Sequence, residues 1–450
     1  MNIASVILAA GKGVRMNSTL PKVLHPILGQ PMVSYAIAAA REVAQTQPIL
    51  VIGHEADEIR RSIGESVQFV VQEPQLGTGH AVLQAEGLLR GRADLVLVTY
   101  ADMPLLTADT LACLIRTHQE QSGAMTMLTV VSEHPRGFGR VLRHTSGDVY
   151  AVVEEAQATP EQLSLNELNV GVYCFDARWL WDALHVIELS PKGEYYLTDL
   201  VGIAARDGRK IHTCSVDNPS ETIGINTRVH LAEASEALRA RINRQWMEEG
   251  VTLINPGSTY IEPAVRIGRD TVIWPDTYLQ GWTEIGEACS IGPNTMLSNT
   301  KVGNACKVLF IVGESAILED RVEVGPFARL RKGAHLAEGV HMGNFGEVKN
   351  SYLGPGSKMG HFSYLGDATL GSKVNIGAGT ITCNYDGEHK HPTEIGAEAF
   401  IGSDTMLVAP VKIGERARTG AGSVVTKDVP PESLAVGIPA RVIRKLVKRD

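Results

Sequence analysis

The C-terminal half of the chain repeats an aliphatic residue at every sixth position. The repeat runs through residues 261–297, 324–348, 353–365, 370–376 and 395–425. Small residues, glycine above all, surround the aliphatic positions. A period of six with this composition is typical of a left-handed parallel β-helix, in which each repeat forms one flat side of a triangular coil and points its aliphatic side chain inward. We therefore predict an all-β C-terminal domain of this type.

The repeat is interrupted between Thr382 and Ile395, where the chain reads CNYDGEHKHPT. This polar, glycine-containing segment cannot continue the coil, so we expect it to leave the coil as a loop. Loops on a rigid scaffold are favoured places for binding and catalysis.

The N-terminal half alternates strand-like and helix-like segments. The runs SVILAA, PILVIG, VQFVVQ and LVLVTYAD predict strands, and MVSYAIAAAREVA, GHAVLQAEGLL and TADTLACLIRTHQ predict helices. This alternation favours a Rossmann-like α/β domain with a mostly parallel sheet. Helix formers without proline lead up to Gly250, which predicts one long helix. The expected organisation is a domain at 1–226, a linker helix at 227–247 and a β-helix at 248–450.

Composition narrows the classes of function. With 42 basic and 50 acidic residues the net charge is −8, which gives no basic footprint for nucleic acid. The six cysteines contain no C-x-x-C pair, which favours reduced thiols and a cytoplasmic protein. No segment approaches the roughly 20 apolar residues of a membrane span. The basic end is interpreted as a solvated terminus; it comprises Arg441, Arg444, Lys445, Lys448 and Arg449.

The segment ILAAGKGVRMNSTLPKVL, residues 7–24, contains the first strand-like run and the turn behind it. It is not a P-loop, which ends in Gly-Lys-Ser/Thr, and Met16 stands where the dinucleotide fingerprint needs its third glycine. In a parallel sheet, residues 8–11 would reach the carboxyl edge, where ligands of open α/β folds bind. Glycines there let backbone N–H groups approach a base or a phosphate.

Charged residues near this edge suit a phosphate ligand. Arg15 and Lys22 can neutralise the charge of phosphate groups. Asp102 closes the strand LVLVTYAD. A single carboxylate suits Mg²⁺, which takes few protein ligands and several substrate oxygens.

The β-helix contains polar side chains that a solenoid does not need. They are Arg331, Lys349, His361, Tyr364, Asn375 and Asn384. Two cations on rigid strands can clamp an anion such as a sugar phosphate. Imidazole is the side chain that titrates near neutral pH, which makes His361 the candidate general base.

Further motifs identify a resemblance. The segments LAAGKGVRM and LPKVL are followed by QLGTGHA, ADMPLL, GFGRV, GEYYLTD and GINTR. This set in this order resembles the sugar-nucleotide pyrophosphorylases. Followed by hexapeptide repeats, it resembles over essentially the whole chain the bifunctional bacterial N-acetylglucosamine-1-phosphate uridyltransferases/glucosamine-1-phosphate acetyltransferases.

For the N-terminal domain the resemblance implies uridylyl transfer from UTP to N-acetylglucosamine 1-phosphate. It makes Asn226 the second Mg²⁺ ligand beside Asp102, with Arg15 and Lys22 in catalytic roles. Ala101 stands where the family usually has glycine. The implied residues for UTP or UDP-N-acetylglucosamine are Leu8, Ala9, Ala10, Gly11, Lys22, Gln72, Gly77, Thr78, Tyr100, Ala101, Asp102, Gly139, Glu154, Asn169 and Asn226.

For the C-terminal domain the resemblance implies acetyl transfer from acetyl-CoA to the 2-amine of glucosamine 1-phosphate. His361 would take the proton of the amine. The sugar phosphate would be bound by Arg331, Lys349, Tyr364 and Asn375, and acetyl-CoA by Ala378, Asn384, Tyr385, Ser403 and Ala421.

Two other functions share this pair of domains. A nucleotidyltransferase for another sugar, such as a glucose-1-phosphate adenylyltransferase, would not need His361 beside Arg331 and Lys349. A non-catalytic assembly subunit would not need Lys22 and Asp102. Since one triangular coil buries little surface, we also expect the prisms to pack side by side in a homotrimer.

Overall fold

The computed structural model describes residues 1–44 and 46–446, and it forms two compact units, Met1–Leu238 and Arg239–Asp450. The boundary between the units falls within the long helix α9 (Arg228–Glu248). Among the described residues, no helix has the length and apolar character of a membrane span. Of the basic end, Lys448 and Arg449 lie outside the described residues.

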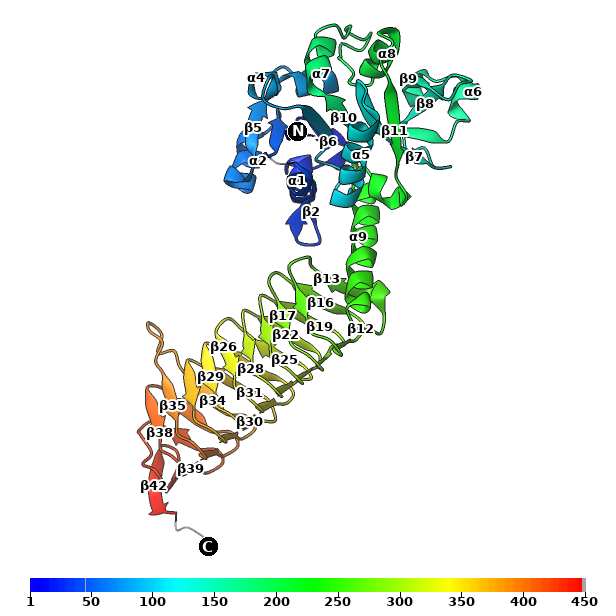
Figure 1. Cartoon of the computed structure of the whole chain (residues 1–450). Helices are drawn as coiled ribbons and strands as arrows, with labels where there is room; N and C mark the ends of the chain where they lie inside the picture. Colours follow the sequence, from blue (N-terminus) through cyan, green and yellow to red (C-terminus); the bar gives the residue numbers. More distant parts are fainter. Residues whose placement is uncertain (45, 447–450) are drawn as a thin grey trace. The chain divides into compact units, whose positions relative to one another are not determined.

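The first unit is built on a nine-stranded sheet. Its strands are β1 (Ile3–Leu8), β4 (Ile49–Ile52), β5 (Gln68–Val71), β6 (Leu95–Tyr100), β7 (Met125–Val131), β8 (Gly139–Arg143), β9 (Val149–Val153), β10 (Glu167–Asp176) and β11 (Ile211–Ser215). The order is β11-β7-β10-β6-β1-β4-β5, with β8 paired to β10 and β9 to β8. Figure 1 shows β5 and β11 on opposite sides of this unit. A two-stranded ribbon, β2 (Pro26–Ile27) and β3 (Gln30–Pro31), lies outside this sheet.

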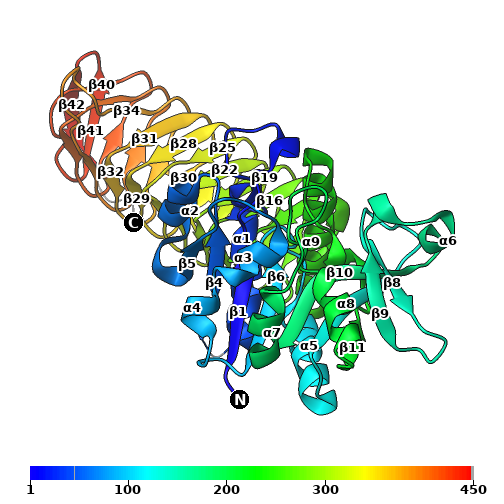
Figure 2. The same cartoon turned by 90° about the horizontal axis from the view of Figure 1, so that it is seen from above.

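Helices cover both faces of this sheet. They are α1 (Met32–Val43), α2 (Ala56–Ile63), α3 (Thr78–Leu83), α4 (Glu86–Leu89), α5 (Ala108–Gln121), α6 (Pro160–Leu163), α7 (Ala177–Leu184) and α8 (Asp199–Arg206). Ile7 of β1 packs with residues of α1 and α2, whereas its neighbour Val6 packs with residues of α3, α7 and α8. Adjacent residues of β1 thus face opposite layers, as strand geometry requires. Figure 2 shows the β8–β9 hairpin and α6 together at one edge of the unit.

The predicted α/β class is confirmed, with two local differences. Strand β10 is antiparallel to both β6 and β7, whereas β1 is parallel to β4 and β6. A fully buried strand has the same apolar pattern in either direction, so the sequence did not distinguish them. The helix expected over residues 79–89 is divided into α3 and α4.

The second unit is the predicted β-helix, and its strands form three parallel sides. Side 1 contains β12 (Thr252–Leu253), β15 (Val272–Ile273), β18 (Ser290–Ile291), β21 (Lys307–Val308), β24 (Glu323–Val324), β27 (His341–Met342), β30 (Lys358–Met359), β33 (Asn375–Ile376), β36 (Phe400–Ile401), β39 (Arg418–Thr419), β41 (Ser433–Gly437) and the antiparallel β42 (Ala440–Lys445). Side 2 contains β13 (Thr259–Ile261), β16 (Thr277–Gln280), β19 (Thr295–Ser298), β22 (Ile311–Glu314), β25 (Ala328–Leu330), β28 (Gly346–Lys349), β31 (Ser363–Gly366), β34 (Ile381–Cys383), β37 (Met406–Val408) and β40 (Val424–Val425). Side 3 contains β14 (Arg266–Ile267), β17 (Glu284–Ile285), β20 (Lys301–Val302), β23 (Ile317–Leu318), β26 (Ala334–Leu336), β29 (Ser351–Leu353), β32 (Ala368–Leu370), β35 (Thr393–Ile395) and β38 (Val411–Ile413).

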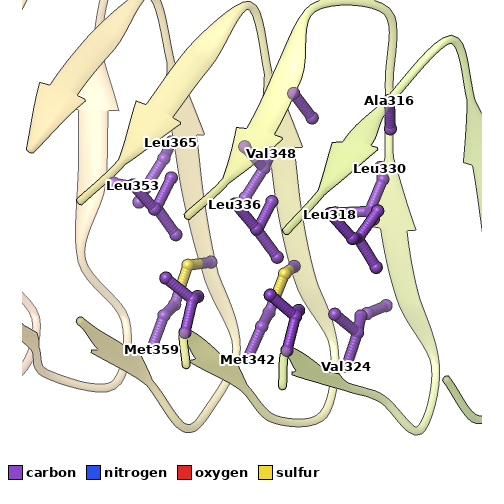
Figure 3. Close-up of a cluster of buried hydrophobic side chains, with 14 of the residues drawn as sticks. Ala316, Leu318, Val324, Leu330, Leu336, Met342, Val348, Leu353, Met359 and Leu365 are labelled. Atoms are coloured by element: carbon purple, nitrogen blue, oxygen red, sulfur yellow. The ribbon is translucent and has the colours of Figure 1, made fainter. Parts of the chain in front are cut away.

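The aliphatic residues of the sequence repeat fill the interior of these coils. Figure 3 shows them stacked in columns, with Val324, Met342 and Met359 in one column and Leu318, Leu336 and Leu353 in another. Each of these side chains is at most 3% exposed. Burial of one such side chain contributes roughly 1.5–3 kcal/mol. The hexapeptide interpretation is therefore confirmed at the level of individual residues.

The interrupting segment is an ordered loop of residues 384–392 between β34 and β35. Tyr385 and Lys390 form an isolated antiparallel bridge within it. The carboxylate of Asp386 accepts hydrogen bonds from the backbone N–H groups of His389 (2.7 Å) and Glu388 (2.8 Å). These bonds and the nearby His391 ring hold the pKa of Asp386 well below its usual range. The loop is thus fixed by its own polar groups.

Candidate functional site

A cavity of about 560 Å³ opens at the carboxyl edge of the first unit's sheet. Strands β6, β1, β4 and β5 are parallel there, so their carboxyl ends meet at one edge. Leu8 ends β1, Tyr100 ends β6 and Gln72 follows β5. The cavity is lined by Leu8, Ala9, Ala10, Gly11, Lys12, Lys22, Val23, Gln72, Gln75, Gly77, Thr78, Ala81, Tyr100, Asp102, Glu194 and Tyr196.

Three predicted residues from distant parts of the chain meet beside this cavity. The Lys22 ammonium contacts the Asp102 carboxylate and donates a 2.8 Å hydrogen bond to Asn226 Oδ1. Asp102 Oδ2 and Asn226 Oδ1 therefore face the same position, which the positively charged Lys22 ammonium occupies. Carboxylate and amide oxygens are hard donors, so this pair fits a divalent cation that takes its other ligands from a bound phosphate. Among the described residues, no group of three or more His, Cys, Asp or Glu could hold a metal by itself.

The glycine-rich loop folds over Lys22. Gly13 has φ +61°, and a Cβ at this position would lie 2.5 Å from Lys22 Cβ. Only glycine combines this backbone conformation with such close approach. Lys12 lines the cavity, whereas Arg15 lies exposed in the 3₁₀ turn Val14–Met16 and does not line it. Lys12 is thus a further candidate for binding phosphate at this cavity.

A second cavity of about 320 Å³ adjoins the first and shares Thr78, Tyr100, Asp102 and Tyr196 with it. Gly139, Glu154 and Asn169, which the resemblance assigns to the sugar, line this cavity, and so does Asn226, the second expected Mg²⁺ ligand. Glu154 accepts a 3.2 Å hydrogen bond from the Thr198 hydroxyl, and Asn169 donates a 2.7 Å hydrogen bond to the Tyr173 hydroxyl. These bonds fix the two side chains. The residues expected to bind the nucleotide and those expected to bind the sugar therefore line two adjoining cavities, which share Asp102.

The remaining N-terminal candidates have structural partners as well. Gln72 donates to Gly77 O at 2.8 Å, and Thr78 Oγ1 accepts from the backbone N–H of Leu197 at 3.0 Å. Gly77 has φ +97°, and a Cβ there would lie 2.7 Å from Tyr195 O. Ala101 is fully buried in the core with residues of α1 and lines neither cavity. Its methyl group therefore does not narrow the nucleotide space.

Tyr100 forms part of the wall between the two cavities. Burial, and to a smaller extent the nearby Asp102 and Glu154 carboxylates, raises the pKa of its phenol above the usual value. The phenol therefore stays neutral, and its hydroxyl is a hydrogen-bonding group rather than a base.

In the β-helix, three cations gather where side 2 turns into side 3. Lys349 ends β28, Arg331 follows β25 and Lys390 belongs to the loop at 384–392. The Lys390 ammonium, and less strongly Arg331, lowers the pKa of Lys349, while Asp367 raises it. Like charges held this close are stabilised by an anion, so the cluster fits a phosphate group.

Two further candidates lie beside this cation cluster. A Cβ on Gly366 would lie 2.3 Å from Tyr364 Oη and 2.8 Å from Asn384 Nδ2, so glycine lets these side chains approach each other. Asn384 is buried and donates to Asp367 Oδ2 at 2.5 Å. Glu347 accepts a 2.9 Å hydrogen bond from Arg331 Nη1 and so holds the guanidinium of this cluster.

The other candidates lie on side 1 or where side 1 turns into side 2. His361 is exposed at that corner, two residues before β31. Backbone hydrogen bonds stack the same corner in later coils: Asp404 N to Ala378 O at 2.6 Å and Gly422 N to Ser403 O at 2.8 Å. Asn375 lies just before this corner in β33, and Ala421 just before Gly422. Within one chain, the width of side 2 therefore separates these residues from the cation cluster.

Several residues that face the sites were missed at the sequence level: Lys12, Gln75, Tyr196, Thr198 and Lys390. Lys12 lies within the quoted glycine-rich segment, and Tyr196 and Thr198 lie within GEYYLTD, so the motifs already marked their positions. Lys390 lies within CNYDGEHKHPT, which was expected to form a loop, but only the folded loop shows that it lies beside Lys349.

Comparison with known proteins agrees with both units. The family model described as "MobA-like NTP transferase domain" matches residues 5–172, and "Bacterial transferase hexapeptide (six repeats)" matches residues 264–299 and 392–427. The "Bifunctional protein GlmU" of Heliobacterium modesticaldum is 48% identical over 438 residues, covering 96% of this chain and 94% of the relative. The protein of that name from Trichlorobacter lovleyi is 45% identical over 457 residues, covering 99% of each chain.

The chain belongs to the GlmU family. GlmU proteins are bifunctional enzymes of UDP-N-acetylglucosamine synthesis, and this GlmU chain has both parts, a nucleotidyltransferase domain and a hexapeptide acyltransferase domain. The sequence-level resemblance and the expected fold are thereby confirmed. The readings as a sugar nucleotidyltransferase alone or as an assembly subunit are not supported.

Proposed function

We propose that the two units catalyse consecutive steps on one sugar phosphate. The second unit transfers the acetyl group of acetyl-CoA to the amine of glucosamine 1-phosphate. The first unit then transfers uridylyl from UTP to N-acetylglucosamine 1-phosphate and releases pyrophosphate. The observation that carries the proposal is that each unit gathers its own cluster of charged and polar groups: Lys22 with Asp102 and Asn226 in one, and Arg331 with Lys349 in the other.

Uridylyl transfer is proposed as an in-line displacement. The phosphate oxygen of the sugar attacks the α-phosphorus of UTP, and the bond to the pyrophosphate oxygen breaks. The attacking oxygen is already anionic at neutral pH, so the protein has to position charges rather than remove a proton. Lys12 and Lys22 bind phosphate oxygens, while Glu154 and Asn169 orient the sugar in the adjoining cavity. Asp102 and Asn226 would hold Mg²⁺, which supplies charge neutralisation at the phosphates when bound.

Acetyl transfer is proposed to use His361 as general base. Arg331, Lys349 and Lys390 bind the phosphate of glucosamine 1-phosphate. As the amine attacks the thioester carbonyl, the C–N bond forms, the C–S bond breaks and coenzyme A leaves as its thiol. The neutral imidazole takes the proton that the amine loses and passes it to the departing sulfur, which gives the thiol.

One experiment tests the whole proposal. Purified protein is incubated with glucosamine 1-phosphate, acetyl-CoA, UTP and Mg²⁺, and the products are identified by mass spectrometry. We expect UDP-N-acetylglucosamine, coenzyme A and pyrophosphate. Omission of acetyl-CoA should leave glucosamine 1-phosphate unconverted, and added N-acetylglucosamine 1-phosphate should restore nucleotide formation. Equal use of ATP in place of UTP would contradict the proposed nucleotide.

The proposed assembly is a homotrimer packed through side 2. In register on that side, Tyr278, Met296 and Val312 point outward and are 40%, 41% and 48% exposed. In the same coils the corresponding positions of side 1 are Val272, Ser290 and Lys307. An exposed apolar column of this kind marks a contact surface. Burial of side 2 against neighbours would also bring His361 of one copy near the loop at 384–392 of another.

Charge on side 2 is therefore expected to disrupt the assembly. The variant Met296→Glu/Val312→Glu should have the mass of a monomer by light scattering, because two buried carboxylates at an apolar contact are strongly unfavourable. Its acetyl transfer should fall while uridylyl transfer is kept. Ile317→Glu is the matched control, since Ile317 is 43% exposed on side 3, and it should keep the parental mass. A parental protein that is monomeric and fully active in acetyl transfer would contradict the trimer.

A cytoplasmic location is proposed as well. All six cysteines are free thiols in the structure. Free thiols are typical of a reducing compartment.

A further inference from the structure

A buried carboxylate joins two segments of the first unit. Glu221 belongs to the 3₁₀ turn Pro219–Thr222 and is 8% exposed. One of its oxygen atoms, Oε2, accepts from Thr107 N at 3.1 Å, Thr107 Oγ1 at 3.1 Å and Thr110 Oγ1 at 2.7 Å. These donors belong to the N-terminal end of α5, and Thr107 is its N-cap. The carboxylate thus binds the start of a 14-residue helix from outside that helix.

The two joined segments each lead to one of the proposed metal ligands. Asp102 precedes Thr107 by five residues, and Asn226 follows Glu221 by five residues. Between these points the backbone N–H of Ile225 donates to Asp102 O at 2.9 Å. The hydrogen bonds of Glu221 therefore join the two segments at one end, and the backbone bond from Ile225 to Asp102 joins them at the other end.

The energetics favour a role beyond local packing. An ionised carboxylate taken out of water is costly unless its hydrogen bonds are replaced. Here they are replaced by two hydroxyl groups, a backbone N–H and the positive end of α5, and these partners also fix the position of the carboxylate. Loss of the carboxylate would leave these donors without their acceptor and would free the segment 219–226 from α5.

We propose that Glu221 is a positioning residue for the divalent cation and UTP, because it sets the spacing between Asp102 and Asn226. The inference rests on the proposed role of those two residues as metal ligands. Glu221 acts through them: it lines neither cavity. Partners of metal ligands typically change metal affinity by about 10–100-fold when they are removed.

The test measures cation binding directly as well as turnover. Mn²⁺ is titrated into the full chain with UTP present and followed by electron paramagnetic resonance, and the Mg²⁺ concentration for half-maximal uridylyl transfer is measured separately. We expect Glu221→Ala to weaken Mn²⁺ binding by about 10–100-fold. It should raise the Mg²⁺ requirement by a similar factor while the rate at saturating Mg²⁺ changes much less. Acetyl transfer should be unchanged.

Asp109→Asn is the matched control. Asp109 is an exposed carboxylate in the first turn of the same helix α5, so its loss removes charge from the helix end without releasing the segment 219–226. It should leave both cation measurements at parental values. Asp102→Ala, measured in parallel, should lose Mn²⁺ binding altogether.

The outcomes separate the two hypotheses. If Glu221→Ala lowers the unfolding temperature but binds Mn²⁺ as the parent does, Glu221 is merely structural and the inference is wrong. If Asp102→Ala keeps Mn²⁺ binding, the proposed metal site itself is wrong. Should Glu221→Ala not fold, Thr110→Val decides: loss of one donor should weaken Mn²⁺ binding in the same direction, and parental binding by this variant overturns the inference.

Discussion

Replacement of Asp102 by alanine is expected to lower uridylyl transfer by at least about 10²–10³-fold while acetyl transfer stays nearly unchanged. The substitution removes the carboxylate that Lys22 contacts and that faces the same point as Asn226 Oδ1. Without it, neither the ammonium nor a divalent cation is held at the phosphates. Initial rates of pyrophosphate release and of coenzyme A release, measured on one preparation, report the two activities.

The two activities provide controls for each other. Asp182→Ala removes a carboxylate of the same unit that is 73% exposed and paired with Arg90, and it should leave uridylyl transfer at the parental rate. If Asp102→Ala lowers both activities together, or neither, the model of two separate sites is wrong.

Replacement of His361 by alanine is expected to lower acetyl transfer by about 10²–10⁴-fold, the usual contribution of a general base. An amine attacks a thioester only as the free base, and near neutral pH much of the sugar amine is protonated. Uridylyl transfer from pre-acetylated sugar phosphate and the mass by light scattering should not change.

A second exposed histidine of the same β-helix gives the comparison. His341 lies on side 1, where its ring is 3.2 Å from Glu323, and His341→Ala should acetylate at the parental rate. Near-parental acetylation by a folded His361→Ala protein would show that His361 is a surface residue of the turn.

The β-helix could be predicted almost residue by residue, because its core depends on one repeated position. The six-residue repeat could not be followed between residues 297 and 324, where the coils become shorter. On side 3, Ile285 aligns with Val302 after 17 residues and Val302 with Leu318 after 16, against 18 from Ile267 to Ile285. Strand register is kept there by shortening the corners, and a search for a fixed period cannot follow such deletions.

The candidate sites were predictable where topology alone brings residues together. Parallel strands end at one edge, so Asp102 and the loop after β1 had to lie close to each other. The contact of Lys22 with Asn226 joins residues 204 positions apart and follows from no local pattern. The bridge from Glu221 to α5 escaped prediction for the same reason: a buried glutamate looks like a surface residue until its partners are known.

The way the loop at 384–392 leaves the coil has a consequence for how the sequence of this protein can vary. Leu370 and Ile395 are 25 positions apart in the chain, yet they are neighbours in register on side 3, and Ile395 continues to Ile413. The apolar column therefore passes beneath the loop without a gap. Each coil contacts only its neighbours, so the free energy of the core is nearly independent of the loop's length and composition. Variation within the loop, Lys390 included, is thereby additive with variation in the coils, and the two can be altered separately.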